Sequence, residues 1–417
     1  MKCLCFCLIL TFSTWSSRTG AKADLAEPEL DPNVSLDEDA FLAKFNEVVN
    51  DPVEKEKRSK ALKKNENNIR RVNRDFINGK SGFYEKINSF SDLPEDEFRK
   101  ERTGLLEKPK YGRGLLISNT TKSDPESERY FDQFRYSRKR VPSTYSSLDK
   151  GYVTEVKSQE LCGSCTAFAS VAAMETVFAK LTGVLTDYSE QELVECGYDG
   201  RTAKGCKGAF IDSYFRYMIN NNRLLMKESF FPYMAKKCEM RNNCPAETPH
   251  NIGARAKRVL YTPYGNEELL KQLVALHGAV VVATTTDMNW ENYWGGVLDR
   301  CTSDDLMKPD NGQHATVVVG YGKEIVQGRW TDYWLIKNSW STQWGEGGFI
   351  KLKRGVGLCG IGKELAVLIA EANNGKTDDV DAVAPCMDTY CNCAQLTFLC
   401  NRITLFQEQC MKTCGVC

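Results

Sequence analysis

Cysteine is the residue type whose number and placement most clearly suggest chemistry in this chain. The 417 residues include 18 cysteines but only 3 histidines. Three of the cysteines lie near the N-terminus, where Lys2 precedes a short apolar run typical of a signal peptide, predicted over residues 1–20. Its removal leaves 15 cysteines in an oxidising compartment, in which disulfides persist. Because 15 is odd, at least one thiol should be unpaired, modified or intermolecular, which is a first sign of a reactive cysteine.

Cys165 lies where a helix is expected to begin. The apolar residues after it recur on one helical face with a single polar break at Glu175, and Gly183 stands where a helix commonly ends. The positive end of a helix dipole stabilises a thiolate. We therefore predict that Cys165 is a nucleophile.

A thiolate needs a base or a cation as its partner, and His314 is the best candidate. It starts a β-branched run that is typical of a buried strand. His250 lies in a loop with a neighbouring proline and His277 at a helix end, so we expect both to be structural. Asn338 follows another strand-like run, and its amide could hold the imidazole in orientation.

The composition argues against two classes of function. Lys plus Arg and Asp plus Glu both number 55, which gives a formal net charge of zero and no case for nucleic-acid binding. Beyond the signal peptide no apolar run approaches the roughly 18 residues that span a bilayer. We expect no nucleic-acid partner, no membrane span, no metal and no cofactor.

The chain divides into regions of different composition. Residues 24–105 are highly charged, lack cysteine and carry apolar residues at helical spacing; a solvated helical hairpin is the plain alternative to a functional role. The next stretch, to residue 140, has little apolar periodicity. It ends in a basic run that is either a processing site after Arg140 or an ordinary solvated cluster. Asn33 and Asn119 begin N-glycosylation sequons.

Residues 141–372 have the glycine, aromatic and cysteine content of a packed catalytic domain, and residues 373–385 form a polar linker. The last 32 residues contain seven cysteines. So small a module cannot bury enough core by itself and must be held by disulfides.

Three segments resemble the papain family of cysteine proteases. They run from Gln159 to Cys165, from His314 to Gly322 and from Lys337 to Glu346, in the family's order, and the resemblance extends over about 141–372. The N-terminal region resembles the family's inhibitory propeptide. The helical residues that carry this second resemblance are Glu54, Arg58, Asn65, Ile69 and Asn73, with a further motif at 88–92.

The resemblance implies an α+β papain-like fold of two lobes. A helical left lobe carries Cys165, and a right β-barrel lobe carries His314 and Asn338. An α-helical inhibitory prosegment precedes the lobes and a small disulfide-rich module follows them. The implied boundaries are 1–20 for the signal peptide, 21–140 for the propeptide, 141–372 for the protease domain, 373–385 for the linker and 386–417 for the module.

The resemblance also implies a zymogen that hydrolyses proteins or peptides, with its own propeptide as inhibitor. Cys165 would attack the scissile carbonyl and His314 would protonate the leaving amine. Gln159 would complete the oxyanion hole, and Asn338 would orient His314. No His-pair insertion of the dipeptidase branch is present, so we expect an endopeptidase. The residues implied to contact substrate are Gly208, Ala209, Ala315, Glu364 and Trp340.

Glu364 is the one indication of specificity. By resemblance it lies at the floor of the S2 pocket, where a carboxylate would accept Arg at P2 as well as a bulky apolar residue. A solvated surface glutamate is the alternative.

Disulfide partners are implied by the resemblance alone. In the protease domain they are Cys162–Cys206, Cys196–Cys238 and Cys301–Cys359. The tail resembles an ShK-toxin-like module, which implies Cys386–Cys417, Cys393–Cys410 and Cys400–Cys414. Cys244 and Cys391 remain, and a bond between them is a further hypothesis.

Several departures from the family pattern leave rival functions open. Thr166 and Ser147 replace tryptophans, Ala209 replaces a glycine, and Gln313 precedes the histidine where Asp or Asn is usual. A weakened, binding-only relative and a tail-mediated toxin-like protein are the alternatives. Thr404-Leu405 stands where channel-blocking tails carry a Lys-aromatic pair, so we expect another, unknown partner for the tail. The secretory pathway is the expected route, ending outside the cell or in an acidic vesicle such as the lysosome.

Overall fold

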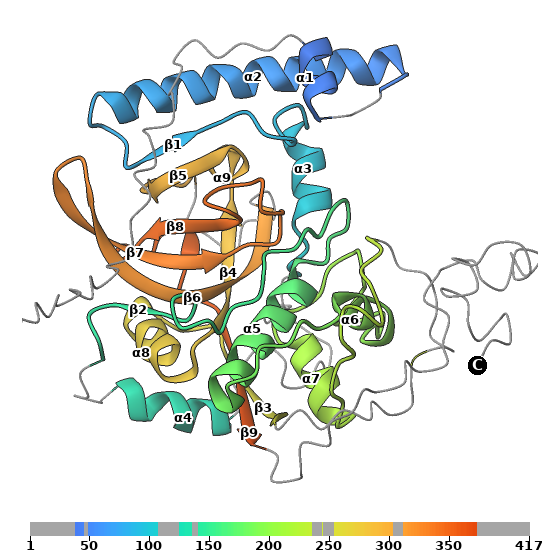
Figure 1. Ribbon diagram of the computed structural model, residues 1–417, viewed down its shortest axis with the longest axis vertical. Coiled ribbons are helices and arrows are strands. Elements are labelled where there is room, and N and C mark those ends of the chain that lie inside the picture. The colour runs from blue at the N-terminus through green and yellow to red at the C-terminus, as the bar shows by residue number, and fades with distance from the viewer. Residues whose placement is uncertain are drawn as a thin grey trace, which may run out of the picture.

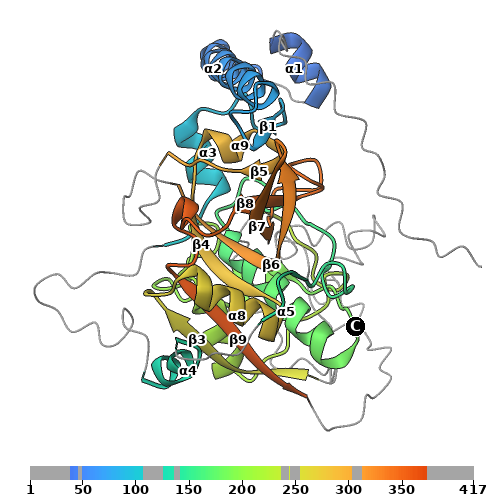
Figure 2. The ribbon, with the colours of Figure 1, turned by 90° about the vertical axis from the view of Figure 1, so that its left-hand side faces the viewer.

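The computed structural model describes residues 38–45, 49–106, 125–135, 141–235, 244, 254–302 and 312–372. We call residues 38–106 the N-terminal segment and residues 141–372 the main domain. The N-terminal segment lies across one end of the main domain (Figure 1). A separate helix, α4 (Pro125–Arg135), lies near the opposite end, as both ribbon views show (Figure 2).

Within the described residues one sheet organises the main domain. Its strand order is β1-β5-β8-β7-β6-β4-β9-β3, and β2 pairs with β6. Neighbouring strands are antiparallel except β5 and β8. The main-domain strands are β2 (Tyr145–Ser146), β3 (Ala254–Thr262), β4 (Val280–Thr286), β5 (Tyr293–Leu298), β6 (Gly312–Val326), β7 (Arg329–Lys337), β8 (Phe349–Lys353) and β9 (Leu365–Ala372).

Helix α5 (Cys165–Thr182) is the central helix of the main domain. Its residues are buried from Cys165 to Ala179, and it packs against β6 and β9. Gly183 ends it in the left-handed conformation with φ 78°, as the sequence predicted. The other main-domain helices are α6 (Glu190–Cys196), α7 (Ser213–Asn220), α8 (Glu267–His277), α9 (Met288–Glu291) and the 3₁₀ turn η2 (Leu358–Gly360).

The N-terminal segment is largely helical, as its apolar spacing predicted. Helix α2 (Pro52–Ile77) begins at Asp51, whose side chain accepts a hydrogen bond from the Val53 N–H. Its buried stripe includes Leu62 and Ile69. The remaining elements of this segment are α1 (Glu38–Phe45), β1 (Phe83–Glu85) and α3 (Glu95–Arg102).

Strand β1 joins the N-terminal segment to the main domain, because it pairs with β5 and extends the sheet by one strand. Phe83 of β1 and Phe98 of α3 are buried in the same core as Trp340 of the main domain. None of the helices in the described residues is long and apolar enough to cross a membrane.

Candidate active site

Cys165 opens helix α5 and lies against the sheet. Its thiol is buried, and it is the one free cysteine among the described residues. The backbone N–H of Ala315, in β6, donates to Sγ at 3.4 Å. The sulfur therefore lies at a helix N-terminus and accepts a backbone N–H, and both of these surroundings favour a thiolate.

His314 is held by two neighbours that follow β7 in the chain. Its Nε2 lies 2.8 Å from Asn338 Oδ1, and its ring stacks on Trp340 at 4.9 Å between centroids. Because a carbonyl oxygen only accepts, Nε2 must carry the proton, which leaves a lone pair on Nδ1. Nδ1 is buried and has no hydrogen-bond partner among the described residues. This tautomer can take a proton from a thiol.

The charge state of the pair follows from its burial. Burial raises the pKa of Cys165 from 9.0 to about 11, although the hydrogen bond from Ala315 opposes this shift. Burial lowers the pKa of His314 to about 4, against the opposing effect of Asn338. Both shifts disfavour charge, so thiol and imidazole are neutral at mildly acidic and neutral pH in this closed form.

Gln159 is fixed by a set of short polar contacts to Cys162 and Ser339. Its Nε2 donates to the Cys162 carbonyl at 2.9 Å, and its Oε1 accepts from Ser339 Oγ at 2.7 Å. Its backbone N–H donates to the Ser339 carbonyl at 2.8 Å. The amide keeps a second N–H, which is the type of donor that an oxyanion hole uses. Sequence reasoning missed Ser339 as the residue that holds this amide, although it lies between Asn338 and Trp340.

The end of the N-terminal segment covers this site. The N–H groups of Gly104 and Leu105 donate to the Gln313 carbonyl, at 3.4 and 3.3 Å. Ala209 N–H donates to the Gly104 carbonyl at 3.0 Å, and its own carbonyl accepts from Leu106 N–H at 2.9 Å. The segment thus bridges the two sides of the site through backbone hydrogen bonds, and the Cys165 side chain has no exposed surface.

The residues predicted to contact substrate lie around this covering segment. Gly208 has φ 97° and touches Gly104 so closely that a Cβ there would overlap the Gly104 carbonyl. Trp340 donates from Nε1 to the Arg102 carbonyl at 3.1 Å. Ala315 supports the sulfur, as described above. Gly208 and Trp340 therefore contact the N-terminal segment, and Ala315 contacts the sulfur.

Strand β4 separates Glu364 from Ala315, the residue that contacts the sulfur. The Glu364 carbonyl accepts from Ala283 N–H at 3.2 Å, and Ala283 pairs with Ala315 across β4 and β6. Its carboxylate is partly exposed and accepts from Tyr261 Oη at 3.0 Å. A tyrosine of β3 therefore orients this carboxylate, which the sequence had not indicated.

The disulfides differ from the expected set at one bond. Cys162–Cys206 and Cys301–Cys359 are present. Cys196 bonds Cys244, so the expected Cys196–Cys238 pair is wrong, and the hypothesis that Cys244 bonds Cys391 is wrong with it. The Cα atoms of Cys196 and Cys244 are 5.7 Å apart, within the range a disulfide spans.

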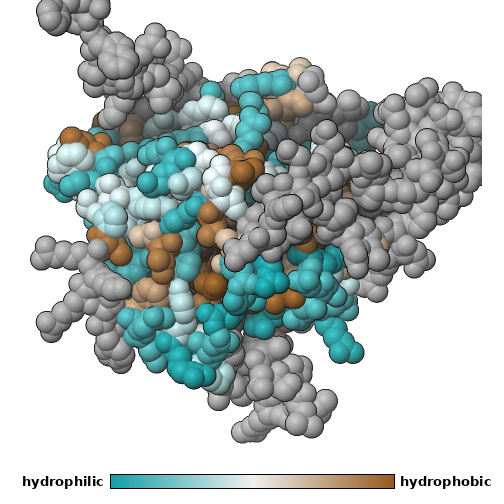
Figure 3. All heavy atoms as spheres, turned by 60° about the horizontal axis from the view of Figure 1, so that its bottom comes forward, coloured by the Kyte–Doolittle hydropathy of each residue, from teal (hydrophilic) through white to brown (hydrophobic). Residues whose placement is uncertain are grey.

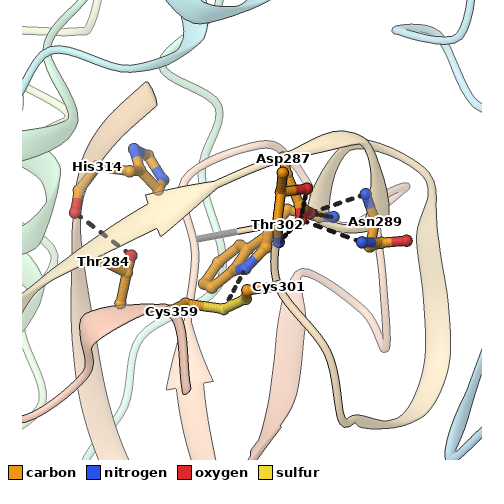
Figure 4. Close-up of a disulfide and its surroundings, with 8 residues drawn as sticks. Thr284, Asp287, Asn289, Cys301, Thr302, His314 and Cys359 are labelled. Atoms are coloured by element: carbon orange, nitrogen blue, oxygen red, sulfur yellow. Dashed lines mark hydrogen bonds between the residues drawn. A yellow bond between two sulfur atoms is a disulfide. The ribbon is translucent and has the colours of Figure 1, made fainter. Parts of the chain in front are cut away.

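The Cys301–Cys359 disulfide lies close to the strand of His314 (Figure 4). Thr284 Oγ1 of β4 donates to the His314 carbonyl at 3.4 Å. Asp287 caps α9 and also accepts from the N–H and hydroxyl of Thr302, next to the disulfide. The Cys301–Cys359 disulfide and the capped helix α9 therefore stabilise this side of the site.

Several predicted sites lie outside the described residues. They are His250, Cys238, the sequons at Asn33 and Asn119, Arg140, and the tail cysteines Cys386, Cys391, Cys393, Cys400, Cys410, Cys414 and Cys417. In the described part of the chain, no group of three or more His, Cys, Asp and Glu side chains is placed to hold a metal ion.

The sequence model of papain family cysteine proteases matches residues 141–369. The chain belongs to the papain family of cysteine proteases. The cathepsin propeptide inhibitor domain (I29) matches residues 39–98, so this thiol endopeptidase is made as a zymogen with an inhibitory propeptide.

Relatives of this papain-family chain are known from plants and animals. The senescence-specific cysteine protease SAG39 of Oryza sativa subsp. indica is 33% identical over 87% of this chain and 94% of its own length. Cathepsin L2 of Homo sapiens is 31% identical over 70% of this chain and 79% of its own. The digestive procathepsin L2 structure from Tenebrio molitor has a TM-score of 0.64 at 27% identity, over 79% of this chain and 98% of that one.

Proposed function

We propose that this zymogen gives rise to a secreted or lysosomal endopeptidase that uses Cys165, His314 and Asn338 as its catalytic triad. The 2.8 Å contact between His314 Nε2 and Asn338 Oδ1 carries the proposal, because it fixes the tautomer that a thiol-activating base needs. The position of Cys165 at the start of α5 supports the same assignment.

Each group of the site has a role in one or more steps of peptide hydrolysis. The Cys165 proton moves to His314 Nδ1, and the thiolate sulfur attacks the scissile carbonyl carbon. The Gln159 amide and the Cys165 backbone N–H donate to the oxyanion that forms. His314 then protonates the leaving amine as the carbon–nitrogen bond breaks, which leaves a thioester. Water, deprotonated by His314, hydrolyses the thioester and restores the thiol.

Latency follows from the covering segment, residues 103–106. These residues occupy both backbone carbonyls that flank the site, those of Ala209 and Gln313, and burial keeps the thiol and the imidazole neutral. We propose that cleavage beyond this segment, with Arg140 as one processing site, removes the inhibitor. The proposed boundaries are 21–140 for the propeptide and 141–372 for the protease domain.

At P2 the enzyme should accept a bulky apolar residue and also Arg. Ala283 and Ala315 provide small apolar neighbours, and Glu364 provides a partly exposed carboxylate that Tyr261 orients. A carboxylate can receive a guanidinium through two parallel hydrogen bonds.

For residues 386–417 we propose an ShK-like module, on sequence resemblance alone, with the three pairs given above and an unknown partner.

The test is hydrolysis of fluorogenic Phe-Arg and Arg-Arg dipeptides, named P2-P1, by the processed protein at mildly acidic pH. Cys165→Ser is the control for contaminating protease, and Glu364→Gln keeps the size of the side chain without its charge. We expect both substrates to be cleaved, with Arg-Arg selectively lost in Glu364→Gln. Processed, folded protein that cleaves neither substrate would favour a binding-only protein.

A further inference from the structure

Helix α4 is packed like a part of the main domain, although it precedes residue 141. Phe131 has no exposed surface and joins the core that includes Leu260 of β3 and Leu273 of α8. Tyr130 and Phe134 pack against the same core. A helix held only as a spacer between propeptide and protease would not need a fully buried aromatic anchor.

The position of α4 separates it from the inhibitory N-terminal segment. The long helix α2 lies at one end of the molecule and α4 at the other, beside β3 and α8 (Figures 1 and 2). Figure 3 turns this end toward the viewer, and on the described surface hydrophobic residues lie among hydrophilic ones. Residues 103–106 can therefore leave the active site without disturbing the contacts of α4.

Polar contacts join α4 to β3, the edge strand of the sheet, and to α8. In the described residues β3 pairs with β9 on one side only, and Ser127 Oγ accepts from Tyr261 N–H at 3.3 Å. Tyr130 Oη lies 2.8 Å from His277 Nε2 at the end of α8. Glu126 forms an ion pair with Arg258 of β3. Core and edge contacts thus fix α4 at several points along its length.

Tyr261 links this helix to the proposed S2 pocket. Its backbone N–H bonds α4, and its hydroxyl donates to the Glu364 carboxylate at 3.0 Å. The residue that orients Glu364 is therefore itself held by Ser127. We propose that α4 is a permanent element of the active protease, which stays on β3 and α8 after residues 38–106 are removed and stabilises the Tyr261–Glu364 pair that accepts Arg at P2.

This inference rests on the proposed function only for the role of Glu364. A cut between residues 106 and 125 leaves α4 covalently attached, and a cut after Arg140 leaves it bound as a separate peptide. In both cases the active enzyme contains residues 125–135.

The first experiment follows α4 by mass and does not depend on activity. The full-length zymogen is processed and passed over a sizing column at pH 6.5, and the protease peak is analysed by intact mass after denaturation. We expect residues 125–135 in that peak and residues 38–106 absent from it. A protease peak that lacks residues 125–135 would overturn the proposal.

The second experiment measures the ratio of Arg-Arg to Phe-Arg hydrolysis. Ser127→Ala removes the acceptor for Tyr261, and Tyr261→Phe removes the donor to Glu364 while α4 stays bound. We expect each to lower the ratio roughly two- to tenfold, which is the range for one hydrogen bond. Gln133→Ala, on the exposed face of α4, is the matched control and should leave the ratio unchanged.

Phe131→Ala should undock α4 from β3 and α8 and lower the ratio further. If that variant does not fold, Ser127→Ala still decides the question. An unchanged ratio in both Ser127→Ala and Tyr261→Phe would overturn the role of α4 in specificity. Wild-type protein that is inactive on Phe-Arg would instead count against the proposed function. The mass experiment would still test whether α4 stays bound.

Discussion

The hydroxyl of Thr166 donates a hydrogen bond to the carbonyl oxygen of Ala209 at 3.2 Å. These two residues replace a tryptophan and a glycine of the family pattern, and the structure brings them into contact. The Ala209 carbonyl is also the group that accepts the N–H of Leu106 from the N-terminal segment. Thr166 therefore holds in place the Ala209 carbonyl, which accepts a hydrogen bond from an extended segment of the chain. The two departures from the family pattern, Thr166 and Ala209, thus contact each other directly.

Thr166→Val should weaken substrate binding more than catalysis. Valine keeps the shape of threonine but removes the donor to Ala209. The loss of one neutral hydrogen bond to the Ala209 carbonyl predicts a KM for Phe-Arg about two- to tenfold higher. The same hydroxyl lowers the pKa of the Cys165 thiol, so its removal should also lower kcat, by a smaller factor. Steady-state kinetics of the processed enzyme measure this split, and Thr166→Ser, which keeps the hydroxyl, should remain close to wild type. A fall in kcat at constant KM would contradict this role.

Removal of the N-terminal segment should move the reactivity of Cys165 to lower pH. In the zymogen, burial raises the pKa of the thiol from 9.0 to about 11, so less thiolate is present at a given pH below both values. Alkylation by iodoacetamide should thus be slow and rise only toward pH 11. After processing, water reaches the site and alkylation should occur at neutral pH and below. Rates from pH 4 to 10, followed by intact mass with Cys165→Ser as control, check this; equal rates for zymogen and enzyme would refute it.

Gly104→Ala should weaken latency. A Cβ at Gly104 would overlap the carbonyl of Gly163, so the backbone over the active site would have to shift. We expect the zymogen to process itself faster, on the order of tenfold, because a steric clash of this kind costs about 1–3 kcal/mol. Gly79→Ala is a matched control: it also strains the N-terminal segment, with φ 70°, but its nearest neighbour lies 3.8 Å away, at Gln327. Equal processing of the two variants would argue against the clash.

Docking of α4 should weaken in acid. Burial, and to a smaller extent Lys180 of α5, lowers the pKa of His277 from 6.5 to about 4, and Tyr130 of α4 is the hydroxyl that faces its Nε2. Because the folded pKa of this base is depressed, its neutral form stabilises docking fully above pH 6.5, and this contribution is lost as pH falls toward 4. Hydrogen exchange of the α4 amides, corrected for intrinsic rates, should show about tenfold weaker protection at pH 5 than at pH 7. His277→Gln keeps a polar side chain that does not titrate, so the protection of the α4 amides should be nearly equal at pH 5 and pH 7.

The parts of the site carried by local sequence could be predicted. Cys165 precedes a helix whose apolar face and terminal Gly183 are visible in the sequence, and His314 lies in a strand of β-branched residues. Such patterns depend on near neighbours in the chain. The partner of Cys196 could not be predicted in this way, because Cys238 and Cys244 lie close together in sequence and only the three-dimensional path decides between them.

Helix α4 escaped prediction for a different reason. Its apolar stripe consists of Tyr130, Phe131 and Phe134 among charged residues, which is short for a helix that would be stable alone. Pro125 at its start and the spacing of the two phenylalanines were the available signals. The helix is stabilised by docking on β3 and α8, and that contact is not encoded within its own eleven residues.

The pairing of β1 with β5 makes activation a loss of structure as well as a gain of access. When β1 leaves, β5 becomes an edge strand, Phe83 is withdrawn from the core, and Trp294 loses the ammonium group of Lys86 that lies 4.2 Å from its ring. We therefore expect the zymogen to be the more stable form, and the enzyme to persist because its unfolding is slow. We expect denaturant unfolding to be reversible for the zymogen and irreversible for the processed enzyme. Each active molecule would in that case have a lifetime that begins at cleavage and cannot be renewed by refolding.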